Sequence, residues 1–540
     1  MKSRTSFFNL TVLRKDITRF APVWSLYLIG GLLIGLGGFG SPRDLADAIA
    51  PMAVINFLYA MIAGEMLFGD LFNSRLCNAL HAFPLRRESW FATHTAAGLL
   101  FSFGPNLILC LCFLPFLGDL WFISLIWLLG LTLEYLFFFG LAAFSAMCTG
   151  NRFAMAAVYT LINFLSMVVY WFVMTFYEPL LYGLHIREDG FVRFCPVAQT
   201  AAFSDLVEIE RYTAVHEHSN IAYTQYRFTG LSADWWYLAI LAVLGIAFLA
   251  AALLLYRRRK LEAAGDFVAF RWLKPIFCVV FTLSTGAFFE LIGQAMFGID
   301  YLFLTVGIVV GYFVSQMLLQ RTVRVFRLKA FGACLIIGGA LVASILLTAL
   351  DPLGITRWTP NPDQVVSVEV SENYYYEPYF TKKALNVSDP EIIEAIVQTH
   401  RQILAEGKET SSNYRPLHLT YRMADGRQVT RRYYYNPNSD AAKPLDTLFS
   451  SPEYILGYED WDAYLTTVKK VSTENATFYG DEAHALLEAI RADCEAGHML
   501  QSRSWVWVHS YLQIETNDGD GISITIFTDC ENTLNWLQEH

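Results

Sequence analysis

The chain is short of charge: Asp, Glu, Lys and Arg make up 16% of its 540 residues, against roughly 25% in soluble domains. Hydrophobic residues make up 55%, and the mean hydropathy is +0.37. The shortage is confined to residues 1–350, because residues 352–540 have a soluble composition. These two regimes exclude a single soluble domain and predict a membrane part followed by an aqueous part.

Several motifs that would give the chain an activity of its own are missing. It has no G-x-x-x-x-G-K-[ST] sequence, and hence no P-loop, and no H-E-x-x-H or C-x-x-C sequence that indicates zinc. His216-Glu217-His218 is a weak metal pattern, for which a solvated loop is the favoured interpretation. Asp518 and Asp520 lack the downstream glutamate of an EF-hand. We therefore expect no metal, no cofactor and no catalytic residues.

Cysteines and basic runs give little indication of a ligand. Cys494 and Cys530 lie in the terminal region, where a disulfide and a reduced pair both remain open. Arg431-Arg432-Tyr433-Tyr434-Tyr435 follows Asp425-Gly426, a hairpin turn signal, and predicts a strand rather than an RNA-binding surface. No basic groove interleaved with aromatic residues is found, so no nucleic acid partner is expected.

Nine apolar stretches approach the ~20 residues that a helix needs to cross the ~30 Å hydrocarbon core. The predicted spans are 21–39, 51–68, 95–117, 121–147, 154–178, 235–256, 276–297, 301–318 and 330–350. The first is interpreted as a retained span, because Gly37-Gly38-Phe39-Gly40 does not resemble a signal cleavage site. The sequence thus predicts an all-α polytopic membrane bundle of about nine transmembrane helices.

Lysine and arginine set the expected orientation, because they accumulate in cytoplasmic loops. With the N-terminus inside, 19 of the 24 basic residues before residue 352 fall on the cytoplasmic side. The opposite orientation would invert a nearly fourfold bias. We therefore expect a cytoplasmic N-terminus and an extracytoplasmic C-terminal domain.

The extracytoplasmic domain is predicted to be α+β. The expected elements are strand 365–370, helix 391–405, hairpin 417–435, strand 467–472, helix 481–495, hairpin 505–528 and helix 531–538. Asp389 is expected to cap the first of the two longer helices, and Asp481 to open the second. The repeated order indicates two copies of a strand–helix–hairpin unit, in which the second copy has an added helix. We expect a binding or packing module.

Two cytoplasmic segments have helical patterns. Before the first span, Leu10, Leu13, Ile17 and Phe20 form one apolar stripe beside basic residues, which predicts a helix in the membrane interface. In loop 69–93, helical spacing relates Phe72, Leu76, Leu80 and Phe83. Pro84 ends that helix, and Arg86-Arg87 follow. A handle for a partner protein and a basic loop that only fixes topology both remain open on composition.

The stretch Leu80-His81-Ala82-Phe83-Pro84-Leu85-Arg86-Arg87, followed by Trp90-Phe91, resembles the "HSLPIKR…LF" segment of type-2 ABC transporter permeases from Gram-positive bacteria. The order of elements is similar too: an interfacial helix, two spans, a coupling helix, three spans, an outer segment and a sixth span. The resemblance covers roughly residues 1–256. The chain departs from the family in its three additional spans, 257–350, and its terminal domain, 351–540.

The resemblance implies a multi-pass permease of a Gram-positive cell membrane, of the exporter type, surrounded by membrane lipid. Its expected partners are a separate ATPase subunit and a second copy of the chain or a paralogous permease. In that family the coupling element contacts the ATPase, which assigns this role to Arg75, His81, Pro84, Arg86 and Arg87. Leu76, Leu80 and Phe83 form the apolar face of the same element.

Three glutamates fall within or at the ends of apolar spans, where a charge costs at least ~2.5 kcal/mol on insertion scales and usually marks a function. Glu134 is the deepest; Glu65 lies near the cytoplasmic end, and Glu290 follows Phe288-Phe289. Each is an intramembrane polar candidate. A hydrogen-bonded glutamate that holds helices together is the alternative interpretation.

Two other classes of protein remain as alternatives. One is a membrane-anchored sensor or regulatory protein with an extracytoplasmic ligand-binding domain. The other is a polytopic glycosyltransferase-like enzyme that uses Asp44 and Asp47, although the first outer loop is short for a lipid-carrier site.

Overall fold

The fold is known from a computed structural model. The structure describes residues 8–37, 45, 49–82, 86–186, 190–202, 207–215, 222–232, 234–298, 301–371, 385–407, 415–436, 439, 443–445, 465–473, 476–496, 508–516, 521–528 and 530–539. The chain divides into two compact units. The first consists of Met1–Met174 with Arg187–Ser344, and the second of Thr175–Ile186 with Ile345–His540.

The first unit is a helical bundle that contains the apolar stretches. In the part of the chain that the structure describes, eight helices are long and apolar enough to cross a membrane, and the chain is a multi-pass membrane protein. They are α4 (Ile49–Leu67), α6 (Arg87–Phe113), α7 (Phe122–Cys148), α8 (Arg152–Phe172), α11 (Asp234–Arg258), α12 (Leu273–Phe297), α13 (Leu302–Gln320) and α14 (Leu328–Ala349). Short 3₁₀ or π segments extend three of these spans to Arg87–Phe116, Gly118–Cys148 and Arg152–Leu180. These eight spans coincide with the last eight predicted ones.

The first predicted span differs from the others. Helix α2 (Ala21–Gly37) is bent by 60° from α1 (Leu10–Arg19), and the spans number nine if this pair is one of them. The break falls at Phe20, where the indole nitrogen of Trp24 donates to the carbonyl oxygen of Ile17 over 3.0 Å. The amphipathic segment before the break thus forms a helix of its own, as its apolar stripe predicts.

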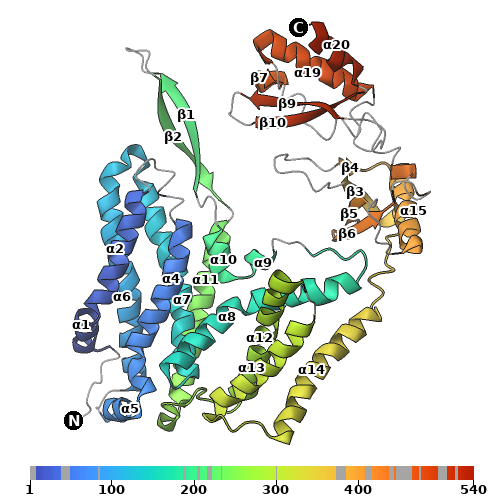
Figure 1. Ribbon diagram of the computed structural model, residues 1–540. Coiled ribbons are helices and arrows are strands. Elements are labelled where there is room, and N and C mark those ends of the chain that lie inside the picture. The colour runs from blue at the N-terminus through green and yellow to red at the C-terminus, as the bar shows by residue number, and fades with distance from the viewer. Residues whose placement is uncertain are drawn as a thin grey trace. The chain divides into compact units, whose positions relative to one another are not determined.

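Close backbone contact joins α7 to α11 (Figure 1). A Cβ atom added at Gly245 of α11 would lie 2.7 Å from the carbonyl oxygen of Leu136, and one at Gly140 of α7 would meet the backbone of Gly245. Only glycine permits this approach, which is a common way for membrane helices to pack. The helices around this contact share one large apolar core.

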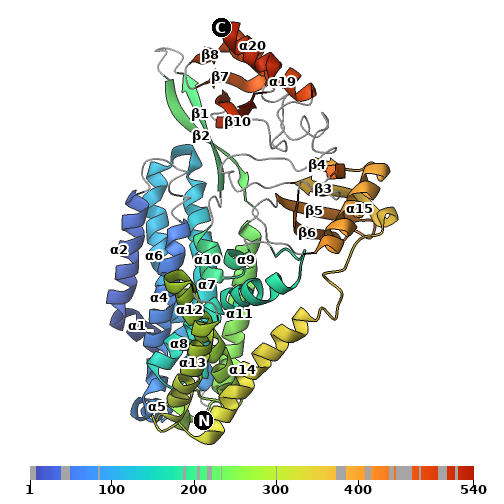
Figure 2. The same cartoon turned by 45° about the vertical axis from the view of Figure 1, so that its right-hand side comes forward.

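The outer segment between the fifth and sixth predicted spans contains helices and strands. This stretch contains η5 (Glu178–Leu180), α9 (Gly190–Arg193), α10 (Pro196–Ala201) and a hairpin, which Figure 2 shows as β1 (Val207–Val215) and β2 (Ala222–Leu231). Cys195, Val197, Val207 and Ile209 are buried in the core of the bundle, so burial of these side chains stabilises the segment. His216-Glu217-His218 lie outside the described residues, as do Asp44 and Asp47.

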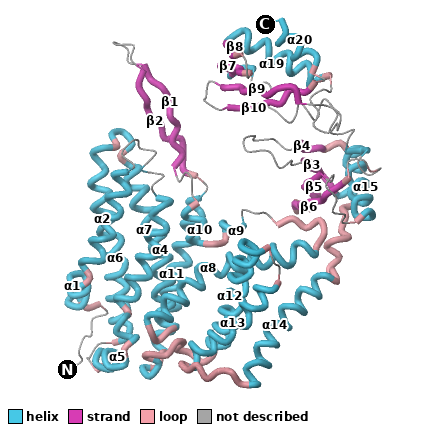
Figure 3. The backbone as a smooth tube through the Cα atoms, viewed as in Figure 1, coloured by secondary structure: helices cyan, strands magenta, loops and turns pink. Residues whose placement is uncertain are grey.

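The second unit contains two four-stranded antiparallel sheets (Figure 3) with the same internal order. The first has the order β4-β3-β5-β6 and the second β8-β7-β9-β10. The strands are β3 (Val365–Ser371), β4 (Leu385–Val387), β5 (Arg415–Met423), β6 (Gln428–Tyr435), β7 (Val468–Ser472), β8 (Thr477–Tyr479), β9 (Val508–Thr516) and β10 (Gly521–Phe527). In each sheet, counted along the chain, a helix lies between the second and third strands. These helices are α15 (Pro390–Glu406) and α19 (Gly480–Glu495), and α20 (Glu531–Glu539) ends the chain.

The two longer helices of this unit begin at the predicted acidic residues. Asp389 precedes α15 and accepts hydrogen bonds from the amides of Glu391 and Ile392. Asp481 lies in the first turn of α19, which agrees with the prediction that this helix begins there. An acid there interacts favourably with the helix dipole. Cys494 and Cys530 are buried in one core.

Candidate functional sites

The predicted coupling loop lies between two spans of the bundle. It begins with η1 (Gly69–Phe72), continues in the short helix α5 (Ser74–His81), and ends where α6 begins at Arg87. Asn73 accepts a hydrogen bond from the amide of Arg75 over 2.9 Å, which supports the start of α5. Arg75, Leu76 and Arg86 are exposed. Only the backbone of Leu80 and His81 is described, and Phe83 and Pro84 lie outside the described residues.

A buried arginine fixes the first half of this loop to the bundle. The Arg259 side chain is 5% exposed. Its Nη1 donates to the carbonyl oxygens of Ala146 (2.6 Å) and Met147 (3.3 Å), and its Nη2 donates to that of Leu71 (3.2 Å). Burial lowers the pKa of the guanidinium to about 10, so it stays protonated at neutral pH. Arg259 therefore ties η1 to the last turn of α7.

A second arginine fixes the other end of the loop. Nη1 of Arg87 donates to the carbonyl oxygens of Tyr256 (3.2 Å), Arg257 (3.4 Å) and Arg259 (3.0 Å), at the end of α11. The cation thus satisfies carbonyl groups that have no partner within the helix. Glu88 forms an ion pair with Arg257 over 3.1 Å. Of the two adjacent predicted docking arginines, Arg87 holds the bundle together and Arg86 is exposed.

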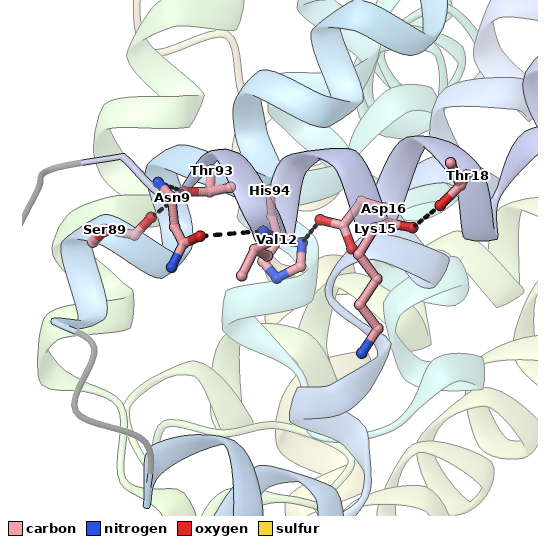
Figure 4. Close-up of polar contacts among 8 residues, drawn as sticks. All are labelled: Asn9, Val12, Lys15, Asp16, Thr18, Ser89, Thr93 and His94. Atoms are coloured by element: carbon pink, nitrogen blue, oxygen red, sulfur yellow. Dashed lines mark hydrogen bonds and ion pairs between the residues drawn. The ribbon is translucent and has the colours of Figure 1, made fainter.

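The interfacial helix α1 packs against the start of α6 (Figure 4). Asp16 is buried, with its Oδ2 2.7 Å from Nδ1 of His94. At the beginning of the helix, the amide of Asn9 donates to the hydroxyl of Thr93 over 3.2 Å. The His94 ring also lies 4.2 Å from that of Trp90. The helix that precedes the first span is therefore attached to the helix that follows the coupling loop.

A chain of buried polar side chains crosses the middle of the bundle. Nδ2 of Asn56 on α4 donates to Oε2 of Glu134 on α7 over 3.0 Å. The Tyr27 hydroxyl on α2 donates to Oδ1 of Asn56 over 2.7 Å. On α6, Nδ2 of Asn106 donates to the Tyr27 hydroxyl over 3.2 Å and to Oγ of Ser102 over 3.0 Å. All five side chains are buried, so this network links four helices through the predicted intramembrane glutamate.

The other two predicted glutamates have different surroundings. Glu290 is fully buried, and its two oxygens accept hydrogen bonds from the amides of Tyr301 (2.8 Å) and Leu304 (2.7 Å) at the start of α13. Glu65 is partly exposed, and Arg152 attracts it electrostatically. Glu134 joins a network of side chains, whereas Glu290 caps a helix.

Sequence reasoning missed Arg259, Asp16 and His94 as site residues. Arg259 stands in the run Arg257-Arg258-Arg259-Lys260, and nothing in the pattern distinguishes it. Asp16 does carry a signal, because it follows Leu13 by three residues and so lies on the apolar face of α1. An acid in that position predicts a buried partner.

Comparisons of the chain with protein-family models, with curated proteins and with solved structures found no match. The function is therefore inferred from the contacts of these sites. In the part of the chain that the structure describes, no three His, Cys, Asp or Glu side chains are grouped to hold a metal ion.

Proposed function

We propose that the chain is the membrane-spanning permease subunit of an ABC transporter of the exporter type, driven through loop 69–93 by a separate ATPase subunit. The N-terminus and this loop face the cytoplasm, and the two-sheet domain is extracytoplasmic. The charge bias of the loops supports this orientation. Because the chain has no P-loop, the energy of ATP must come from another subunit.

The observation that carries the proposal is the attachment of the loop. Arg259 holds its first part to α7, and Arg87 holds its end to α11. Between these two points, α5 presents exposed Arg75 and Leu76. A loop that only fixed topology would not need such attachments. A docking element does, because a force applied to α5 must move transmembrane helices rather than only bend the loop.

The test is a charge reversal at the exposed arginines, Arg75→Glu with Arg86→Glu. Arg87 is left intact, because its removal would disturb the end of α11. The matched control is Arg324→Glu with Arg327→Glu, two exposed arginines before α14. A tagged protein is expected to co-purify with an ATPase subunit and to stimulate its ATP hydrolysis.

Reversal at Arg75 and Arg86 should abolish co-purification or lower the stimulated rate at least tenfold, while the control keeps both. Each variant must first elute as a single species in detergent. Equal stimulation by the two double variants would remove the docking role from this loop. ATP hydrolysis by the purified chain alone would overturn the proposed class.

A further inference from the structure

The second unit contains a cavity of about 560 Å³ at the place where two membrane spans end. One wall consists of Leu180 and Tyr182, at and just after the end of the span Arg152–Leu180. Another consists of Ala349 and Leu350, at the end of α14. The remaining lining residues are Asp351, Thr356, Arg357, Thr359, Arg401, Leu404 and Ala405. Because both spans end here, this cavity lies at the boundary of the hydrocarbon layer.

The polar part of the cavity is cationic. Arg357 and Arg401 both line it and are exposed. Neither forms an ion pair with another residue that the structure describes. The one acidic lining residue, Asp351, accepts hydrogen bonds from the amides of Ile355 (2.8 Å) and Thr356 (2.9 Å), and also from the Thr356 hydroxyl. The Thr356 hydroxyl is the main cause of a lowered pKa at Asp351, and this carboxylate is already used by its own turn.

The apolar part of the cavity continues along α14. Of the residues of this helix, only Cys334 is buried, so most of its apolar side chains are at least partly exposed. Leu346, Leu347 and Leu350, in and after its last turn, are exposed by 59% or more. An aliphatic chain is therefore able to lie along the end of α14, with the group attached to it between the two arginines.

We propose that this cavity binds the headgroup of an anionic phospholipid whose acyl chains lie along α14. Guanidinium groups bind phosphate through paired, charge-assisted hydrogen bonds. The cavity offers two of them beside an apolar wall that a soluble anion would not use. A zwitterionic lipid should bind less tightly, because its own cation would be placed beside two guanidinium groups. The proposal does not depend on the transport function.

The test uses the full-length protein in detergent, freed of native lipid, with native mass spectrometry and thermal unfolding as readouts. The probes are phosphatidylglycerol, phosphatidylcholine and sn-glycerol 1-phosphate. The variant is Arg357→Gln with Arg401→Gln. The matched control is Arg422→Gln with Arg427→Gln, which removes the same charge from exposed positions of the first sheet.

Phosphatidylglycerol is expected to bind more tightly than phosphatidylcholine and to raise the unfolding temperature. Loss of both arginines should weaken its binding roughly tenfold or more, because it removes the charge-assisted hydrogen bonds to the phosphate. The control should bind it as the parent does. Equal phosphatidylglycerol binding by both double variants would overturn the proposal. Equal stabilisation by sn-glycerol 1-phosphate would overturn its lipid part and leave a site for a soluble anion.

Discussion

Glu290 offers a direct test of whether an intramembrane acid stabilises the fold or takes part in transport. It lies on α12, and its carboxylate accepts hydrogen bonds from the amides of Tyr301 and Leu304, where α13 begins. The first amide groups of a helix have no partner within that helix. In the hydrocarbon layer no water replaces such a partner, so the glutamate of one helix completes the beginning of the next.

Replacing Glu290 with glutamine keeps the size of the side chain but turns one acceptor into a donor. One amide of α13 then faces an NH₂ group and loses its hydrogen bond, at a cost of about 1.5–3 kcal/mol for a bond to a charged group. Loss of the negative charge beside the helix N-terminus adds about 0.3–1 kcal/mol. The expected total is about 2–4 kcal/mol, which corresponds to a fall in unfolding temperature of roughly 2–4 °C for a chain of 540 residues.

The assay heats detergent-solubilised protein and follows the monodisperse fraction by size-exclusion chromatography. The matched control is Glu262→Gln, at an exposed position between α11 and α12. Glu290→Gln should lose stability while its stimulation of the partner ATPase, per folded molecule, stays at the parental level. A variant as stable as the parent would refute the capping role. Full stability combined with lost stimulation would instead assign Glu290 to the transport pathway.

Two further predictions concern charge. In Arg259→Lys, one ammonium group cannot reach both η1 and α7, so the free energy of unfolding should fall by about 1.5–3 kcal/mol. Proteolysis within α5 should become faster. An unchanged rate of proteolysis would contradict the role of Arg259 in fixing the loop. Burial lowers the pKa of His400 to about 3 and that of His418 to about 4, so both are neutral in the folded domain at neutral pH. In the unfolded chain, both histidines bind protons below a pKa of about 6.5. The free energy of unfolding should therefore decrease as the pH is lowered from about 6.5 toward 4, by at most about 1.4 kcal/mol per pH unit for each histidine. Far-UV circular dichroism melts at pH 7 and pH 5 would show this, and His400→Phe with His418→Phe should flatten the dependence.

The membrane spans were predictable because length and apolar composition alone define them. Eight predicted ranges coincide with helices, within a few residues except where α6 continues back to Arg87. The first span was less predictable, because the bend at Phe20 depends on packing and on the Trp24 side chain. The close backbone approach between Gly140 and Gly245 was not predictable either, because no local pattern relates these two glycines.

In the terminal domain, alternation and turn residues predicted most elements. Val365–Ser371 alternates, and Gly426 has φ 83° in the predicted hairpin turn, a left-handed conformation that glycine favours. The hairpin of β1 and β2 was missed, although Val207 and Ile209 alternate with Glu208 and Glu210. Its composition is polar enough to resemble a loop. Only contact with the bundle shows that Val207 and Ile209 are buried.

The buried polar contacts were not predictable, because their partners are far apart in the chain. Asn56 and Glu134 are separated by 78 residues, and Leu71 and Arg259 by 188. The sequence does predict that an intramembrane glutamate has a partner. It does not identify the partner, since any polar side chain of a neighbouring helix satisfies the same requirement.

Helix α7 connects the two sites that the proposed function requires. Its last turn receives Arg259, which also holds the start of the coupling loop, and its middle carries Glu134. Glu134 is bonded to Asn56 on α4, the helix that leads into that same loop. Because a helix is stiff along its axis, displacement of the loop would move the ends of α4 and α7 beside it together. The Asn56–Glu134 bond resists separation of these two helices in the membrane. The same network continues to α2 and α6 through Tyr27 and Asn106, so a displacement of α4 would act on these helices as well.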